Sequence, residues 1–282
     1  MMRLRLTTLC ENTAGKLGFT GEWGLSILIE HKETTLLLDT GLSDSIISNS
    51  RSAGVDLNAI DKVVLSHGHK DHTGGLRAYL EATVGETQII AHPHIWQKKY
   101  SVRPEASKDR PHFIGIPYIK EEFEYLGARF HLSREPIWLN AEIVTTGEVP
   151  MVTAFEKVDE NLYVQTEKGM MPDPLWDDQA LVIKTSKGLV IVLGCAHHGM
   201  INTLIRAREI TGVEPIYMVI GGTHLLRATK ETLQKTIEKL EELGVERIGV
   251  SHCTGMSAAM TLAQRFENNF FFNHTGRVVE ID

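Results

Sequence analysis

Apolar and polar positions alternate along the chain in patterns that predict strands and helices in turn. Strand-length apolar runs fall at residues 4–9, 24–30, 34–39, 62–65, 88–91, 143–150, 179–184, 188–193, 215–220, 247–251, 270–272 and 276–281. Helical spacing or composition falls at residues 43–53, 73–83, 202–210, 230–243 and 257–266. Strands that alternate with helices and end in polar turns predict an α/β (α+β) protein with its functional residues at strand ends.

Residues 95–171 depart from this layered pattern. We predict a single domain over residues 1–282, with this stretch as a substrate-facing insertion. Its cations Lys98, Lys99, Arg103 and Arg110 suit contact with an anionic substrate, because ammonium and guanidinium groups bind phosphate well. An ordinary solvated loop is the alternative for the same residues.

Composition narrows the class of protein. The 282 residues are 42% hydrophobic, which is enough for a substantial core, and the net charge of −7 argues against nucleic acid as a partner. No apolar run approaches the roughly 18 residues of a membrane span, and the first residues are too polar for a secretory signal. Three cysteines without a framework spacing predict no disulfides, so we expect a cytoplasmic protein, with homo-oligomerisation left open.

The densest candidate site directly follows the apolar run at residues 62–65. His67, His69, Asp71 and His72 occur within six residues, beside glycines that allow a tight turn. Imidazole nitrogen and carboxylate oxygen suit zinc and related metals. One metal rarely takes four ligands from one turn, so two adjacent ions are expected to divide them. A solvated polar loop or a helix cap is the alternative.

Other strand ends also present ligand-type residues. Cys195 with His197, His224 and His252 each follow an apolar strand and lie beside glycine, which favours convergence on one site over separate polar turns. Asp39 also ends a strand. It is interpreted either as a turn-forming residue or as a hydrogen-bond partner that orients a metal-bound histidine.

The pattern His67-x-His69-x-Asp71-His72 after a strand resembles the signature of the metallo-β-lactamase fold superfamily. This resemblance implies a four-layer αββα sandwich with two divalent metal ions, zinc first, with manganese or iron as alternatives. It also implies a middle histidine, a bridging aspartate and a late histidine. His252 matches the late histidine, but Cys195 stands in place of the bridging aspartate. Asp177-Asp178 stands where the middle histidine would be, and His197 can take that role.

The segments around Cys195, His224 and His252 resemble one subgroup of this superfamily more narrowly. That subgroup includes metal-dependent hydrolases and 7,8-dihydropterin-6-methyl-4-(β-D-ribofuranosyl)aminobenzene 5′-phosphate synthase. Cys195 and Asp178 are left open as ligands or as residues that support ligands.

Three functions are compatible with these residues. The first is a hydrolase that acts on a phosphate-containing small molecule through a metal-activated water, with Asp71 orienting the nucleophile and His224 as acid or oxyanion stabiliser. The second is a transferase that joins a dihydropterin pyrophosphate to a ribofuranosylaminobenzene phosphate. The third is a non-catalytic metal or ligand sensor.

Overall fold

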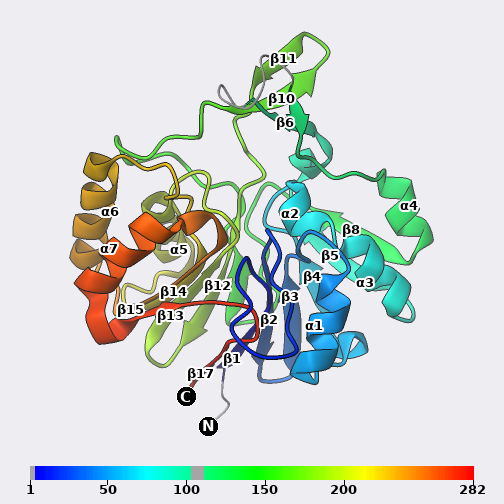
Figure 1. Ribbon diagram of the computed structural model, residues 1–282, viewed down its shortest axis with the longest axis horizontal. Helices are drawn as coiled ribbons and strands as arrows, with labels where there is room; N and C mark the ends of the chain where they lie inside the picture. The colour runs from blue at the N-terminus through cyan, green and yellow to red at the C-terminus, as the bar shows by residue number, and fades with distance from the viewer. Residues whose placement is uncertain (1–3, 103–110) are drawn as a thin grey trace. The chain divides into compact units, whose positions relative to one another are not determined.

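The computed structural model describes residues 4–102 and 111–282 (Figure 1). The predicted anion contacts Arg103 and Arg110 lie outside these described residues. The chain divides into two compact units. Unit 1 contains Met1–Leu132, Val158–Asp177 and Thr275–Asp282, and unit 2 contains Ser133–Lys157 and Asp178–His274.

Unit 1 is built on a seven-stranded sheet with the strand order β17-β1-β2-β3-β4-β5-β8. Its strands are β1 (Leu4–Cys10), β2 (Ser26–His31), β3 (Thr34–Leu38), β4 (Lys62–Val64), β5 (Thr87–Ala91), β8 (Ala128–Leu132) and β17 (Val278–Ile281). Strands β3, β4, β5 and β8 are parallel, whereas β17, β1 and β2 pair antiparallel. The carboxyl ends of the parallel strands therefore lie at one edge, where polar residues can meet.

The helices of unit 1 cover one face of this sheet (Figure 1). They are α1 (Ser45–Ala53), α2 (Lys70–Thr73), α3 (Leu76–Ala82) and α4 (Lys120–Tyr125), with short 3₁₀ turns at Leu57–Ala59 and Pro93–Trp96. Ile46, Leu76 and Phe123 belong to one buried cluster with Val63 and Ile89 of the sheet. Burial of this apolar area stabilises unit 1 and fixes the strand ends that carry its site.

The helix predicted over residues 73–83 is confirmed as α3 (Leu76–Ala82), and the separate short helix α2 (Lys70–Thr73) precedes it. The carbonyl oxygen of His72 accepts hydrogen bonds from the amide of Thr40 at 2.7 Å and from its hydroxyl at 3.1 Å. In a continuous α-helix, the His72 carbonyl would instead accept the amide four residues later, that of Leu76. A Cβ at Gly74 or Gly75 would lie 2.1 Å from a backbone oxygen, so only glycine permits this close approach.

A four-stranded antiparallel sheet occupies part of the range predicted as an insertion. Its order is β11-β10-β6-β7, with β6 (Lys98–Ser101), β7 (His112–Phe113), β10 (Leu162–Thr166) and β11 (Gly169–Pro172). The same range also supplies α4 and β8 to unit 1 and β9 (Ile143–Thr145) to unit 2. Residues 95–171 thus contribute to three sheets, and periodicity alone did not separate these contributions.

Unit 2 has a six-stranded sheet with the order β16-β15-β14-β13-β12-β9. Its remaining strands are β12 (Ala180–Thr185), β13 (Gly188–Leu193), β14 (Ile216–Gly222), β15 (Arg247–Ser251) and β16 (Phe270–Phe272). The predicted hairpin is confirmed, because β12 and β13 pair from Ala180–Leu193 to Thr185–Gly188. From β13 to β16 the strands are parallel, so their carboxyl ends again share one edge.

Three helices pack on the sheet of unit 2: α5 (Met200–Thr211), α6 (Lys230–Glu242) and α7 (Met256–Phe266). Leu204, Leu240 and Leu262 are fully buried in one cluster with Ile191 and Ile248. The two short 3₁₀ turns of this unit are His252–Thr254 and Glu267–Asn269. Within residues 4–102 and 111–282, none of the helices has the length and apolar character needed to cross a membrane.

Candidate metal centre

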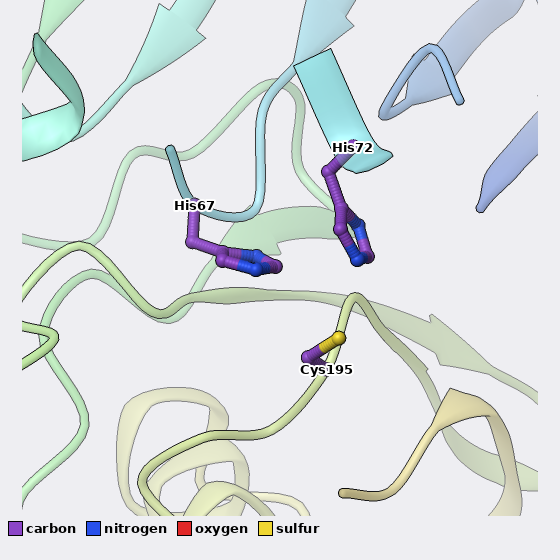
Figure 2. A group of neighbouring side chains, drawn as sticks. All are labelled: His67, His72 and Cys195. Atoms are coloured by element: carbon purple, nitrogen blue, oxygen red, sulfur yellow. The ribbon is translucent and has the colours of Figure 1, made fainter. Parts of the chain in front are cut away.

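The donor residues of unit 1 begin directly after β4. His67 and His69 lie in the turn, and Asp71 and His72 lie in the short helix α2. His67 Nε2 and His69 Nδ1 are 3.0 Å apart, and the rings of His67 and His72 have centroids 4.2 Å apart (Figure 2). All three imidazoles are buried, whereas Asp71 is half-buried. The turn therefore gathers nitrogen donors in a dry environment, next to a carboxylate that reaches solvent.

Asp39 holds this arrangement from the end of β3. Its Oδ2 lies 2.6 Å from His72 Nδ1, and its two oxygens accept hydrogen bonds of 2.7 Å from the amide and hydroxyl of Ser66. The Ser66 hydroxyl lies 2.9 Å from His67 Nδ1. One buried carboxylate thus orients His72 directly and His67 through Ser66, as expected of a partner that supports metal ligands.

His69 is held in its neutral form. Burial is the main cause that lowers its pKa to about 3, and Lys99 and His72 lower it further, against Asp71 and Asp177. Only the neutral imidazole has a lone pair to donate to a metal. His69 is therefore ready to bind an ion at neutral pH without first losing a proton.

The donor residues of unit 2 follow three neighbouring parallel strands. Cys195 and His197 follow β13, His224 follows β14, and His252 and Cys253 follow β15. The donor atoms of Cys195, His197 and His224 lie within 4.8 Å of one another, as do those of Cys195, His252 and Cys253. Figure 2 draws Cys195 in the loop after β13. Sulfur and imidazole donors thus gather at one edge of the sheet.

Backbone conformation marks the same positions. Ala196, His224 and His252 in unit 2 have φ values of 52°, 51° and 52°, and Asp39 in unit 1 has 59°. A non-glycine residue with such a left-handed φ costs about 1–3 kcal/mol of stability, and this kind of backbone strain clusters at functional sites. The surrounding fold therefore imposes these conformations at the strand ends that carry the donor residues.

Cys253 was not among the predicted site residues. Its Sγ accepts a hydrogen bond from the His224 amide at 3.3 Å. Burial raises its pKa, but hydrogen bonds with Cys195 and His224 and the nearby His252 outweigh burial and hold the pKa of the Cys253 thiol well below its usual value. Its position next to His252, directly after a strand, was the signal that could have identified it.

The adjacent residues Asp177 and Asp178 each support a loop. Asp178 Oδ2 accepts the amide of His198 at 2.9 Å, in the loop that carries Cys195 and His197. Asp177 Oδ2 accepts the amide of Gly68 at 2.7 Å, between His67 and His69. Asp178 was predicted as a ligand or a supporting residue, and the support of the loop is the contact described here. Asp177 was not predicted as a site residue.

The predicted anion contacts Lys98 and Lys99 point to opposite faces of β6. Lys98 is exposed, whereas the Lys99 side chain is fully buried and its ammonium donates to Asp173 at 2.9 Å and Asp177 at 2.8 Å. Burial lowers the pKa of Lys99, but the two carboxylates outweigh it and raise the pKa above its usual value. Lys99 therefore differs from the solvent-facing cation that the prediction of a substrate-facing insertion implied, because its charge is buried and paired with two carboxylates.

The donor chemistry fits a divalent metal in both units. Imidazole nitrogen, carboxylate oxygen and thiolate sulfur are the ligands that zinc takes, and the cysteine sulfurs of unit 2 disfavour magnesium or calcium. Buried imidazoles with nitrogens 3.0 Å apart are arranged to share an ion. His67, His69, Asp71 and His72 in unit 1 and the sulfur and imidazole donors of unit 2 are therefore suitable ligands.

The sequence profile of the metallo-β-lactamase superfamily matches residues 24–252. The chain belongs to this superfamily. Family membership confirms the predicted fold class, the α/β metallo-β-lactamase fold known as the αββα sandwich.

Individual relatives agree with this assignment. The chain is 34% identical to 7,8-dihydropterin-6-methyl-4-(β-D-ribofuranosyl)-aminobenzene-5′-phosphate synthase of Methanocaldococcus jannaschii, over 98% of this chain and 96% of the relative. A crystal structure of a metal-dependent hydrolase of the β-lactamase superfamily is similar with a TM-score of 0.84 and 28% identity, covering 99% of each chain. A diphosphatase of the PhnP family has a TM-score of 0.55 at 15% identity, covers 100% of this chain and 98% of its own, and shows the fold alone. The first two relatives support an enzyme.

Proposed function

We propose that this protein is a metal-dependent hydrolase that acts on a phosphate-containing small molecule. The observation that carries the proposal is the buried histidine cluster after β4, with Asp39 fixing His72 and, through Ser66, His67. A merely structural polar turn has no need for three buried imidazoles around a carboxylate. Metal-assisted hydrolysis does need neutral, oriented imidazoles in a dry pocket beside a carboxylate that reaches solvent.

Two divalent ions are the proposed cofactors, with zinc first and manganese or iron as alternatives. When bound, they lower the pKa of water towards 7 and polarise a phosphoryl oxygen. The proposed ligands in unit 1 are His67, His69, Asp71 and His72. The proposed ligands in unit 2 are Cys195, His197 and His252, with Asp178 supporting the loop of the first two. Cys195 in place of the usual aspartate favours zinc or iron over manganese.

Two side chains are proposed for proton handling. The half-buried carboxylate of Asp71 orients the attacking water and accepts its proton, and the half-buried ring of His224 gives a proton to the leaving oxygen. The His224 ring lies with its centroid 4.2 Å from that of His197. In water-driven cleavage the P–O bond to water forms, the P–O bond to the leaving group breaks, and the leaving oxygen takes the proton.

Substrate binding is proposed for the exposed cation Lys98, together with Arg103 and Arg110. An exposed ammonium on β6 is free to move towards a phosphate oxygen, which the buried Lys99 is not. Alanine at Lys98 should raise KM for a phosphorylated substrate and leave kcat nearly unchanged. An unchanged KM would remove Lys98 from the binding site.

The central test measures metal content and phosphodiesterase activity together. Protein purified without added metal is analysed for metal per chain and assayed with bis-p-nitrophenyl phosphate. We expect two equivalents of metal and turnover, with both reduced in His67→Ala and in His252→Ala. His131→Ala is the matched control, because His131 is exposed on β8. No turnover after reconstitution with zinc, manganese or iron would contradict the hydrolase and leave the transferase and the sensor as the candidates.

The second candidate function is a transferase, and the name of the Methanocaldococcus jannaschii relative favours it. Such an enzyme would join a dihydropterin pyrophosphate to a ribofuranosylaminobenzene phosphate and release pyrophosphate. A pyrophosphate assay with and without the arylamine separates the two functions. Release that requires the arylamine supports the transferase, and release with water alone supports the hydrolase.

His224 can serve as the acid or as a further ligand, since its nitrogen lies among the donors of unit 2. His224→Ala should keep the metal content and lower kcat most for substrates with a poor leaving group. Loss of one metal equivalent with equal effects on all leaving groups would make His224 a ligand instead.

A further inference from the structure

The fully buried ammonium of Lys99 has no part in the chemistry proposed above. It lies on β6, whose neighbouring residue Lys98 is exposed on the opposite face. Its partners Asp173 and Asp177 are also buried, with side chains 1% and 0% exposed. Burial of three ionisable groups carries a large desolvation cost, so stability alone is a weak explanation for such a cluster.

The carboxylate of Asp177 links this cluster to the donor turn. One of its oxygens accepts from Lys99 Nζ at 2.8 Å, and the other accepts the amide of Gly68 at 2.7 Å. Gly68 lies between His67 and His69. A Cβ at this position would lie 2.4 Å from the carbonyl oxygen of Ile95, so the turn is packed directly against backbone on its other side.

A second connection runs from the backbone of Lys99 to the same turn. The Lys99 carbonyl accepts the amide of Ile114 at 2.9 Å, and the Ile114 carbonyl accepts the amide of Lys70 at 2.7 Å. Lys70 begins α2 and directly follows His69. One strand residue therefore reaches both neighbours of His69, Gly68 through its side chain and Lys70 through its backbone.

We propose that Lys99 is a positioning residue that holds the backbone on both sides of His69 in its metal-binding geometry. The inference rests on the proposed metal site. The ammonium fixes Asp177, and Asp177 fixes the Gly68 amide. Without the positive charge, Asp173 and Asp177 would be two buried carboxylates that repel each other, and Asp177 would turn away from Gly68.

The first test examines the turn without metal. Hydrogen–deuterium exchange is followed in a peptide covering residues 66–72 of the metal-free protein. Lys99→Met should accelerate exchange there, and Lys98→Met is the matched control, with the same substitution one residue earlier on an exposed site. Unchanged exchange in Lys99→Met would overturn the positioning role, whatever the catalytic activity is.

The second test measures zinc affinity by competition with a chromogenic chelator. Lys99→Met and Asp177→Asn should weaken zinc binding by about 10–100-fold, as is typical when partners of metal ligands are changed. Asp173→Asn should have a smaller effect, because the Asp173 carboxylate accepts from Lys99 and from the Leu175 amide, whereas that of Asp177 accepts from the turn itself. If Lys99→Met does not fold, the other two variants test the inference. It then requires a larger loss of zinc affinity in Asp177→Asn than in Asp173→Asn.

The two tests separate this inference from the proposed function. Faster exchange in Lys99→Met with no zinc binding in the parent protein would keep the positioning of the turn but contradict the metal enzyme. Zinc binding in the parent that is equal in Lys99→Met and Asp177→Asn would keep the metal enzyme and overturn the inference.

Discussion

At the scale of single residues, Asp39 contacts two neighbouring parts of the donor turn, Ser66 and His72. It ends β3 with a positive φ, and its two oxygens bond with Ser66 and His72 at 2.6–2.7 Å. A buried carboxylate with these partners fixes the tautomer and orientation of His72, so that Nε2 faces away from Asp39 as a donor.

Asp39→Asn should therefore weaken zinc binding by about 10–100-fold, because the amide cannot supply two accepting oxygens. Asp44→Asn is the matched control, since Asp44 is exposed and makes no side-chain cap bond to α1. Chelator competition on both variants measures the effect. Equal zinc affinity in the two variants would show that Asp39 does not orient His72.

The neutral state of His69 predicts a pH dependence of stability in the metal-free protein. The unfolded chain binds a proton at this residue with a pKa near 6.5, whereas the folded chain does so only near about 3. Below pH 6.5 the unfolded state therefore binds more protons, and the free energy of unfolding should fall by about 2–3 kcal/mol between about pH 6 and pH 4.

Urea denaturation at several pH values tests this expectation, with His69→Gln as the comparison. The glutamine variant cannot take up the proton, so its stability should depend less on pH over this range. Parallel curves for the parent protein and the variant would assign the pH dependence to other groups.

Residues that follow strands could be predicted from the sequence, among them Asp39 as a partner of a histidine, whereas the supporting residues Asp177 and Lys99 could not. A local pattern is sufficient to identify the candidate donors after β4, because they lie within six residues and follow an apolar run: His67, His69, Asp71 and His72. Gly68 and Asp177 are 109 residues apart, and Lys99 and Asp173 are 74 residues apart. Nothing in hydrophobic periodicity pairs residues at such separations, and a buried lysine has the same local pattern as an exposed one.

At the scale of elements, the start of α5 depends on a carboxylate from outside the helix. Glu156 accepts the amides of Ile201 and Asn202 at 2.8 and 2.9 Å, two of the donors that a helix leaves unpaired in its first turn. The helix begins beside Gly199, where a Cβ would lie 2.3 Å from the Glu156 carboxylate. Residues 195–198 precede this helix directly, so the same contact holds the end of the donor loop.

Glu156→Ala should lower the free energy of unfolding by about 2–4 kcal/mol, because two buried amides lose their acceptor. Glu160→Ala, at an exposed position of the same loop region, should leave it unchanged. Denaturant melts measure both variants. Equal midpoints would show that the amides of α5 find another acceptor.

Two elements have boundaries within one residue of those that the sequence pattern predicted. Predicted helix 230–243 is α6 at Lys230–Glu242, and predicted strand 88–91 is β5 at Thr87–Ala91. The helix predicted over residues 73–83 is α3 at Leu76–Ala82, and it begins after Gly75 because close contacts of Gly74 and Gly75 with the segment after β3 separate it from α2. In the sequence, the only sign of these close backbone contacts is the pair of glycines, Gly74 and Gly75.

At the scale of the whole molecule, β17 completes the sheet that β1 begins. Leu6 pairs with Val279, and Val279 is 6% exposed whereas the next residue, Glu280, is exposed. Val279→Lys should destabilise the protein by about 3 kcal/mol, because it places a charge where an apolar side chain is buried. Glu280→Lys on the other face is the control, and thermal melts compare them. Equal melting temperatures would mean that β17 adds little to unit 1.

The pairing of β17 with β1 sets the order in which unit 1 can finish folding on the ribosome. β1 is synthesised long before β17, and its outer backbone groups lack their partner until Val278–Ile281 has been synthesised. All of unit 2 is made in that interval. A nascent chain therefore displays an open strand edge throughout the translation of unit 2, and open edges are templates for association between chains. Slow translation of the second half should increase the demand of this protein for chaperones.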